Sequence, residues 1–221
     1  MATPTSGEHS KTPSGPGDSH PARRVSSRVS NLAHGLSRAA RRFPERPGLV
    51  QGERIWTWRE IDRAAHEIAA ALREAGIATG DRVLVHSRHC EEMFSAMFAV
   101  FRLGAVWTPT NFRLTPPEVV ALAQDSGARA LLCHVDFPDH AAAVRAAAPS
   151  LRLVWTMGGA ATFGDARLLD RRAAHAGASV ADAAVDYDDP CWVFFTSGPT
   201  GRSKAAVLTH GHLAFIVTNH L

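Results

Sequence analysis

Residues 191–210 read CWVFFTSGPTGRSKAAVLTH and hold the most informative pattern in the chain. An apolar run of β-forming residues, 191–195, precedes a loop of small and hydroxyl-bearing residues, and a second apolar run, 205–208, follows Lys204. Glycines let backbone N–H groups approach an anion, hydroxyls add donors, and lysine supplies positive charge. The stretch therefore predicts a strand–loop–strand unit whose loop, residues 196–204, holds a phosphate group.

Lys204 is unusual because the chain otherwise carries its positive charge on arginine. Of 24 basic residues, only Lys11 and Lys204 are lysine. A lysine is a compact, mobile point charge that suits phosphate binding. A Gly-rich turn with a solvated lysine is the alternative interpretation of the same residues. Two other nucleotide motifs are excluded by spacing, because neither G-x-x-x-x-G-K-S/T nor a G-x-G-x-x-G after the first strand is present.

Strand and helix patterns alternate on the N-terminal side of this stretch. Thr57–Glu60 and Thr115–Glu118 both have the capping-box pattern that begins a helix. Because strands and helices alternate, we predict an α/β fold with a mainly parallel sheet and helices on both faces. The predicted helices are about residues 57–75, 91–102, 115–127 and 139–148, and the predicted strands are 83–85, 105–108, 130–133 and 151–155, with a small hairpin at 49–56.

Charge is unevenly distributed along the 221 residues. Residues 1–42 hold seven basic and two acidic side chains, a net charge of +5, whereas the remainder carries −2. The body is slightly acidic, so no nucleic-acid partner is predicted. Residues 1–29 are rich in Pro, Gly and Ser, which predicts a disordered basic leader before a folded unit over 30–221.

The cysteines and the apolar runs bear on location. Cys90, Cys133 and Cys191 are odd in number and far apart, which favours reduced thiols over a disulfide framework or a zinc site. No run approaches the ~20 apolar residues of a membrane span, and the N-terminus is polar where a signal peptide needs an apolar run. We therefore expect a cytoplasmic protein without a membrane span.

Four motifs in order resemble those of the adenylate-forming, or AMP-binding, superfamily. Residues 196–210 are similar to its signature T-S-G-S/T-T-G-x-P-K-G-V-x-x-T-H. WTWREI at 56–61, GDRV at 80–83 and FRLGAVWTPTN at 101–111 are similar to three earlier motifs. The resemblance covers roughly residues 30–221 and is closer to acid–CoA ligases than to peptide-synthetase domains.

The resemblance implies an ATP-dependent acyl-CoA synthetase of fatty acid metabolism. In such enzymes a carboxylate attacks the α-phosphorus of ATP, pyrophosphate leaves, and the thiol of CoA then takes the acyl group. The implied co-substrates are ATP, Mg²⁺, CoA and a small carboxylic acid, for which a fatty acid is the expected class. The residues assigned to the ATP phosphates are Thr196, Ser197, Gly198, Thr200, Gly201 and Lys204.

The same resemblance implies that this chain is the N-terminal portion of the adenylate-forming fold. Family members run to more than twice its length, and their catalytic lysine and magnesium-binding acid fall beyond Leu221. The chain by itself is therefore not expected to be catalytically complete. Two alternatives stay open: a non-catalytic protein that keeps part of the fold for binding, and a fatty-acyl-AMP ligase that omits the CoA step.

Three loop positions depart from the signature. Pro199 replaces a Ser or Thr and removes a hydroxyl and a backbone N–H, and Ser203 replaces a proline. Ala205 replaces a glycine, which matters if that position needs a positive φ. Together these changes predict that ATP affinity is weakened or lost.

Smaller groups have competing interpretations. The histidines at 210–220 and the aspartates at 186–189 lack the ligand spacing of a metal site, so loop and helix-start roles are expected and no metal ligand is predicted. The apolar side chains of residues 93–98 (MFSAMF) fit either a core or the wall of an acyl pocket, and the core is the favoured interpretation.

Overall fold

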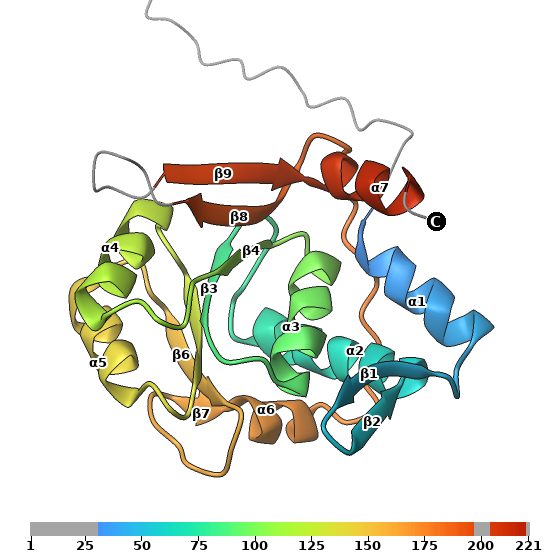
Figure 1. Ribbon diagram of the computed structural model, residues 1–221, viewed down its shortest axis with the longest axis horizontal. Coiled ribbons are helices and arrows are strands. Elements are labelled where there is room, and N and C mark those ends of the chain that lie inside the picture. The colour runs from blue at the N-terminus through green and yellow to red at the C-terminus, as the bar shows by residue number, and fades with distance from the viewer. Residues whose placement is uncertain (1–30, 197–203, 220–221) are drawn as a thin grey trace, which may run out of the picture.

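The structure, a computed structural model, describes residues 31–196 and 204–219, so the expected leader lies outside the described residues. A seven-stranded sheet has the order β7-β6-β5-β3-β4-β8-β9, and a two-stranded hairpin of β1 and β2 lies apart from it (Figure 1). The strands are β1 (Pro47–Gln51), β2 (Arg54–Thr57), β3 (Arg82–His86), β4 (Val106–Pro109), β5 (Ala130–His134), β6 (Leu153–Met157), β7 (Ala166–Arg167), β8 (Pro190–Thr196) and β9 (Lys204–Thr209).

Helices cover both faces of the large sheet. One apolar cluster joins α2, α3 and α6 to one face, and a second joins α4 and α5 to the other (Figure 1). Alternate residues of β3 divide between these clusters, with Val83 and Val85 in the first and Leu84 in the second, as the period of a strand requires. The helices are α1 (Ala33–Arg42), α2 (Trp58–Glu74), α3 (Glu91–Arg102), α4 (Pro116–Ser126), α5 (Pro138–Ala147), α6 (Leu168–Ala174) and α7 (His210–Asn219).

The sheet is parallel from β7 through β8, and only the pairing of β8 with β9 is antiparallel. The α/β class with a mainly parallel sheet and helices on both faces is therefore confirmed. β9 pairs with the strand that precedes it, whereas each parallel pair needs a crossover, and helices supply most of these crossovers.

Local sequence signals explain where two of the helices begin. The Thr57 hydroxyl accepts a hydrogen bond from the backbone N–H of Glu60, and the Glu60 carboxylate accepts one from the N–H of Thr57. Thr115 and Glu118 form the same reciprocal pair at the start of α4. Both predicted capping boxes are confirmed, because each depends on groups only three residues apart.

The segment between β6 and β8, for which the sequence predicts no element, supplies β7 and α6. After α6 the chain runs back past the helices, and Val180 and Val185 are buried on the way. Among the described residues, no helix is both long enough and apolar enough to cross a membrane.

Candidate functional site

The hairpin of β8 and β9 brings together the two ends of the expected phosphate loop. Thr196 pairs with Lys204 across the hairpin, and the Thr196 hydroxyl donates to the Lys204 carbonyl oxygen at 3.3 Å. Both side chains are exposed. The other four expected contacts, Ser197, Gly198, Thr200 and Gly201, lie outside the described residues, as do Pro199 and Ser203.

Ala205 is accommodated without strain. It lies in β9 opposite Phe195, and among the described residues no residue other than glycine has a positive φ. A glycine at this position would not be needed for its backbone freedom. Of the three departures from the family signature, the one at Ala205 therefore leaves the hairpin intact.

The hairpin ends at the edge of the sheet where ligands usually bind. β8 runs parallel to β4 through the single pair Trp107 and Trp192, so Thr196 lies at the carboxyl ends of the parallel strands. In open α/β sheets, ligands bind in the crevice outside these ends. The two described residues of the expected phosphate site are therefore at the edge where the fold class places binding sites.

A cavity of about 980 Å³ lies at the same edge. Trp107 of β4 and Trp192 and Phe194 of β8 line it, and the rings of Trp192 and Phe194 stack with centroids 4.8 Å apart. A few polar side chains, among them Asn111 and Glu118, complete the wall. The size and the mainly apolar wall are typical of a pocket for a small organic ligand.

Helix α3 contributes to both the core and the cavity. Ala96 and Ala99 are fully buried on its sheet-facing side, whereas Met93, Phe94 and Met97 line the cavity. Both interpretations of residues 93–98 therefore hold, because Met93 and Met97 also pack against the core cluster. Helical spacing puts apolar residues on one face but does not say whether another element covers that face.

The hairpin of β1 and β2 forms the far wall of the cavity. Leu49, Val50 and Gln51 line it, and the Gln51 amide Nε2 donates to the carbonyl oxygen of His89 at 2.9 Å. This hydrogen bond joins the hairpin to the segment between β3 and α3. The hairpin is predicted from the sequence but its place in the site is not, because nothing local fixes where a hairpin docks.

The histidines at the start of α7 have structural roles. His210 is fully buried, and its Nδ1 accepts a hydrogen bond from the backbone N–H of Leu32 at 3.3 Å. Burial lowers the pKa of His210 to about 4, so the ring is neutral. His212 Nδ1 accepts from the N–H of Thr209, whereas His220 lies outside the described residues.

The aspartates at 186–189 form a turn before β8, in which the Asp189 carboxylate accepts from the N–H of Asp186 at 2.7 Å. In residues 31–196 and 204–219, no group of three or more His, Cys, Asp or Glu side chains is placed to hold a metal ion.

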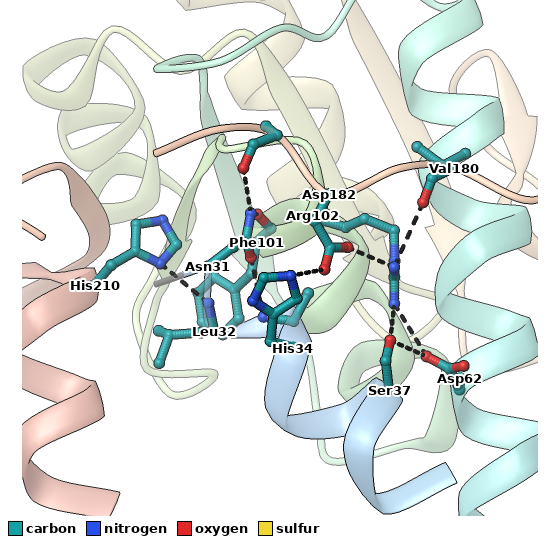
Figure 2. A network of polar contacts seen from close by, with 12 residues as sticks. Asn31, Leu32, His34, Ser37, Asp62, Phe101, Arg102, Val180, Asp182 and His210 are labelled. Atoms are coloured by element: carbon teal, nitrogen blue, oxygen red, sulfur yellow. Dashed lines mark hydrogen bonds and ion pairs between the residues drawn. The ribbon is translucent and has the colours of Figure 1, made fainter. Parts of the chain in front are cut away.

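A buried polar network joins α1, α2 and α3 to the segment that follows α6, and it is not predicted from the sequence. Figure 2 shows Arg102 of α3 pointing between Asp62 of α2 and Asp182, with its Nη2 also donating to Ser37 of α1 at 3.1 Å. The Asn31 amide Nδ2 donates to the carbonyl oxygen of Phe101 at 2.8 Å (Figure 2).

The network links the start of α7 to the rest of the domain. Leu32, which follows Asn31, donates to His210, so the residue after β9 is held by the N-terminal helix (Figure 2). An arginine at the end of the apolar run of α3, residues 96–101, is the one sequence signal that points to this network. Its partners lie 40 to 80 residues away and could not be named from the sequence.

Several known proteins are similar to this chain. A feruloyl-CoA synthase from Amycolatopsis sp. is 35% identical over 184 residues, which make up 83% of this chain and 34% of that protein. A fatty acid–acyl-carrier-protein ligase from Streptomyces coeruleorubidus is 31% identical over 182 residues, covering 82% of this chain and 33% of that protein. The chain thus spans about a third of the length of these curated relatives.

The fold is shared with solved structures of the same kind. A fatty acyl-CoA synthetase from Mycobacterium tuberculosis superposes with a TM-score of 0.69 at 27% identity, covering 82% of this chain and 35% of that one. Residues 36–221 match the family described as AMP-binding enzyme, which is most of the chain and includes the hairpin of β8 and β9. The chain therefore belongs to the AMP-binding enzyme family.

Proposed function

We propose that this chain is the N-terminal portion, over residues 30–221, of an ATP-dependent acid–CoA ligase. The observation that carries the proposal is the placement of Thr196 and Lys204 beside a large apolar cavity at the carboxyl edge of the sheet. A ligase needs a polar, positively charged site for the phosphates of its nucleotide and an adjoining apolar site for its acid. The ligase relatives support the same activity.

The phosphate site would consist of the hairpin ends and the loop between them. Lys204 would supply the positive charge that stabilises the departing pyrophosphate, an effect of position and electrostatics. The Thr196 hydroxyl is held by the Lys204 carbonyl and keeps its lone pairs for a donor or for Mg²⁺. Ser197, Gly198, Thr200 and Gly201 would complete the contacts to the ATP phosphates.

The cavity would take the apolar part of the carboxylic acid. Its wall of Met93, Phe94, Met97 and two tryptophans suits a fatty or aromatic acyl group, and burial of such a group is favourable at roughly 25 cal/mol per Å². The acids named for the relatives, ferulate and a fatty acid, are of these two kinds. CoA would then accept the acyl group in the complete protein.

We also propose a cytoplasmic location. The three cysteines are free, and Cys133 and Cys191 are fully buried, as in a protein that keeps its thiols reduced. Burial raises the pKa of both thiols to about 12, so they are unreactive.

Pyrophosphate exchange tests the ligase proposal. The complete gene product, supplied with Mg²⁺, ATP and a panel of apolar carboxylic acids, should exchange labelled pyrophosphate into ATP. Lys204→Ala should lower the exchange rate about a hundredfold or more, because it removes the charge at the leaving group. Lys11→Ala is the matched control, since it removes the chain's only other lysine, and it should have no effect. Unchanged exchange in Lys204→Ala would refute the assignment.

A non-catalytic binding role is the second candidate, and Pro199 favours it because it removes a backbone donor from the loop. Binding of ATP to the chain of residues 1–221 distinguishes the two. Millimolar Mg²⁺–ATP should raise the melting temperature if the loop still binds nucleotide. An unchanged melting temperature would mean that this chain has no phosphate site, and a binding role would then rest on the cavity alone.

A fatty-acyl-AMP ligase is the third candidate, favoured by the acyl-carrier-protein ligase among the relatives. Both kinds of ligase exchange pyrophosphate, so the exchange assay does not separate them. Formation of the acyl thioester with CoA as the only thiol would favour the acid–CoA ligase. Transfer to an acyl-carrier protein without transfer to CoA would favour the third candidate.

A further inference from the structure

The loop of residues 110–114 forms one wall of the cavity, and two histidines form hydrogen bonds with its first and last residues. Thr110, Asn111 and Leu114 of this loop line the cavity. The loop is compact, because the N–H of Leu114 donates to the carbonyl oxygen of Asn111 at 3.0 Å. Its position sets how far the wall extends into the cavity.

His86 holds the first residue of the loop. His86 ends β3, is fully buried, and its Nδ1 lies 2.7 Å from the hydroxyl oxygen of Thr110. The Thr110 hydroxyl donates its single hydrogen to the carbonyl oxygen of Val85 at 3.1 Å, so the proton between His86 and Thr110 must be on Nδ1. His86 is thus a donor to the loop.

His140 holds the last residue of the loop. Its Nε2 lies 2.8 Å from the carbonyl oxygen of Leu114, and because a carbonyl can only accept, Nε2 carries the proton. The rings of His86 and His140 stack with centroids 4.5 Å apart and planes at 21°. Phe137 packs edge-on against both rings. The two anchors of the loop therefore support each other.

We propose that His86 and His140 are positioning residues, which fix the cavity wall at Thr110 and Leu114 and so set the affinity of the cavity for an apolar acid. The inference rests on the proposed function only in that the cavity takes the acid. Neither histidine lines the cavity, so neither contacts the ligand directly. For His140, the hydrogen bond that Nε2 donates, rather than the stacking of the ring, determines this affinity.

Two variants of His140 separate the donor from the ring. His140→Gln keeps an N–H donor near the place of Nε2 and loses the ring, whereas His140→Phe keeps a stacking ring and loses the donor. His175→Phe is the matched control, because His175 is also half-buried and hydrogen-bonded to a backbone carbonyl, but it directly follows α6 and lies outside the loop. All of these proteins should fold, since the positions are only partly buried.

Binding of cis-parinaric acid, a fluorescent apolar carboxylic acid, measures the affinity of the cavity. We expect His140→Phe to bind it roughly threefold to tenfold more weakly, and His140→Gln and His175→Phe to bind within about twofold of the wild type. Apolar side chains are also exposed on β9 and α7. Met97→Trp, which narrows the cavity, should therefore lower the part of the signal that belongs to the cavity and leave the part from these exposed side chains unchanged.

Hydrogen exchange at the amide of Leu114 gives a readout without a ligand. The amide should exchange faster in His140→Phe and at the wild-type rate in His140→Gln. Equal behaviour of the two His140 variants, in binding and in exchange, would overturn the inference. If the wild type binds no parinaric acid, the assignment of the acid to the cavity fails, and the exchange rates alone then decide the positioning role.

Discussion

Replacing Arg102 by methionine should be among the most damaging single changes in this domain. The Arg102 side chain is 3% exposed and forms ion pairs with Asp62, at 3.0 Å, and with Asp182. Those carboxylates are themselves largely covered, with 20% and 11% of their side chains exposed. Methionine keeps the length and apolar stem of the arginine but leaves two largely covered carboxylates without their arginine partner. Among the described residues, only histidines remain as possible ion-pair partners, His66 for Asp62 at 3.8 Å and His34 for Asp182 at 3.1 Å.

The expected loss follows from that imbalance. Breaking a buried ion pair by removing one partner costs about 3–5 kcal/mol, because the remaining charge is buried and uncompensated. Total unfolding free energies are of order 5–15 kcal/mol, so this loss is a large fraction of the whole. For a domain of this size it corresponds to a melting temperature lower by roughly 6–20 °C.

Urea unfolding followed by circular dichroism measures the effect directly. Arg59→Met is the control, because Arg59 pairs with Glu45 at the surface, where both side chains are more than half exposed, and such a pair is worth about 1 kcal/mol or less. Adding Asp62→Asn and Asp182→Asn to Arg102→Met removes the two carboxylate charges that have lost the arginine and should recover part of the loss. A loss in Arg102→Met no larger than that in Arg59→Met would refute the reasoning.

Three further predictions concern local features. Thr57→Ala should lower the unfolding free energy by about 1 kcal/mol in urea titrations, because it removes one half of a capping box. Burial lowers the pKa of both His86 and His210 to about 4. The stability that depends on these neutral rings is therefore fully present above pH ~6.5, the pKa of histidine in the unfolded chain. As the pH falls to ~5.5, the free energy of unfolding should decrease by about 1.4 kcal/mol for each histidine. A free energy of unfolding that does not change between pH ~7 and ~5.5 would contradict this. Gly164→Ala should destabilise more than Gly177→Ala in thermal melts: both have positive φ, but only at Gly164 would the new Cβ lie 2.6 Å from a backbone oxygen.

Much of the fold could be predicted from the sequence because its signals are local. The capping boxes at Thr57 and Thr115 and the helix end at Gly127 depend on groups within a few residues of one another. The alternation of strands and helices then selects a mainly parallel sheet. The short β7 and α6 could not be predicted, since β7 is stabilised by pairing with β6, and α6 by packing on α2 and β6, rather than by their own patterns.

The candidate site was predictable in part. Thr196 and Lys204 could be named from the loop pattern, and the structure places them opposite each other. The role of His140 could not be predicted, because its partner, the Leu114 carbonyl, is on another element and the sequence gives no sign of the contact. The same holds for Arg102, whose carboxylate partners come from distant segments.

By itself, the sequence determined the class of fold, the order of its elements and the motifs that place the chain in its family. These depend on hydrogen bonds and side-chain periods within short segments, which any reader of the sequence can count. The tertiary structure decided the strand order, the cavity behind Met97 and the tie between His140 and the loop at Leu114. Such features arise only when distant segments pack together, because burial and shape belong to the assembled chain and not to any one segment of it.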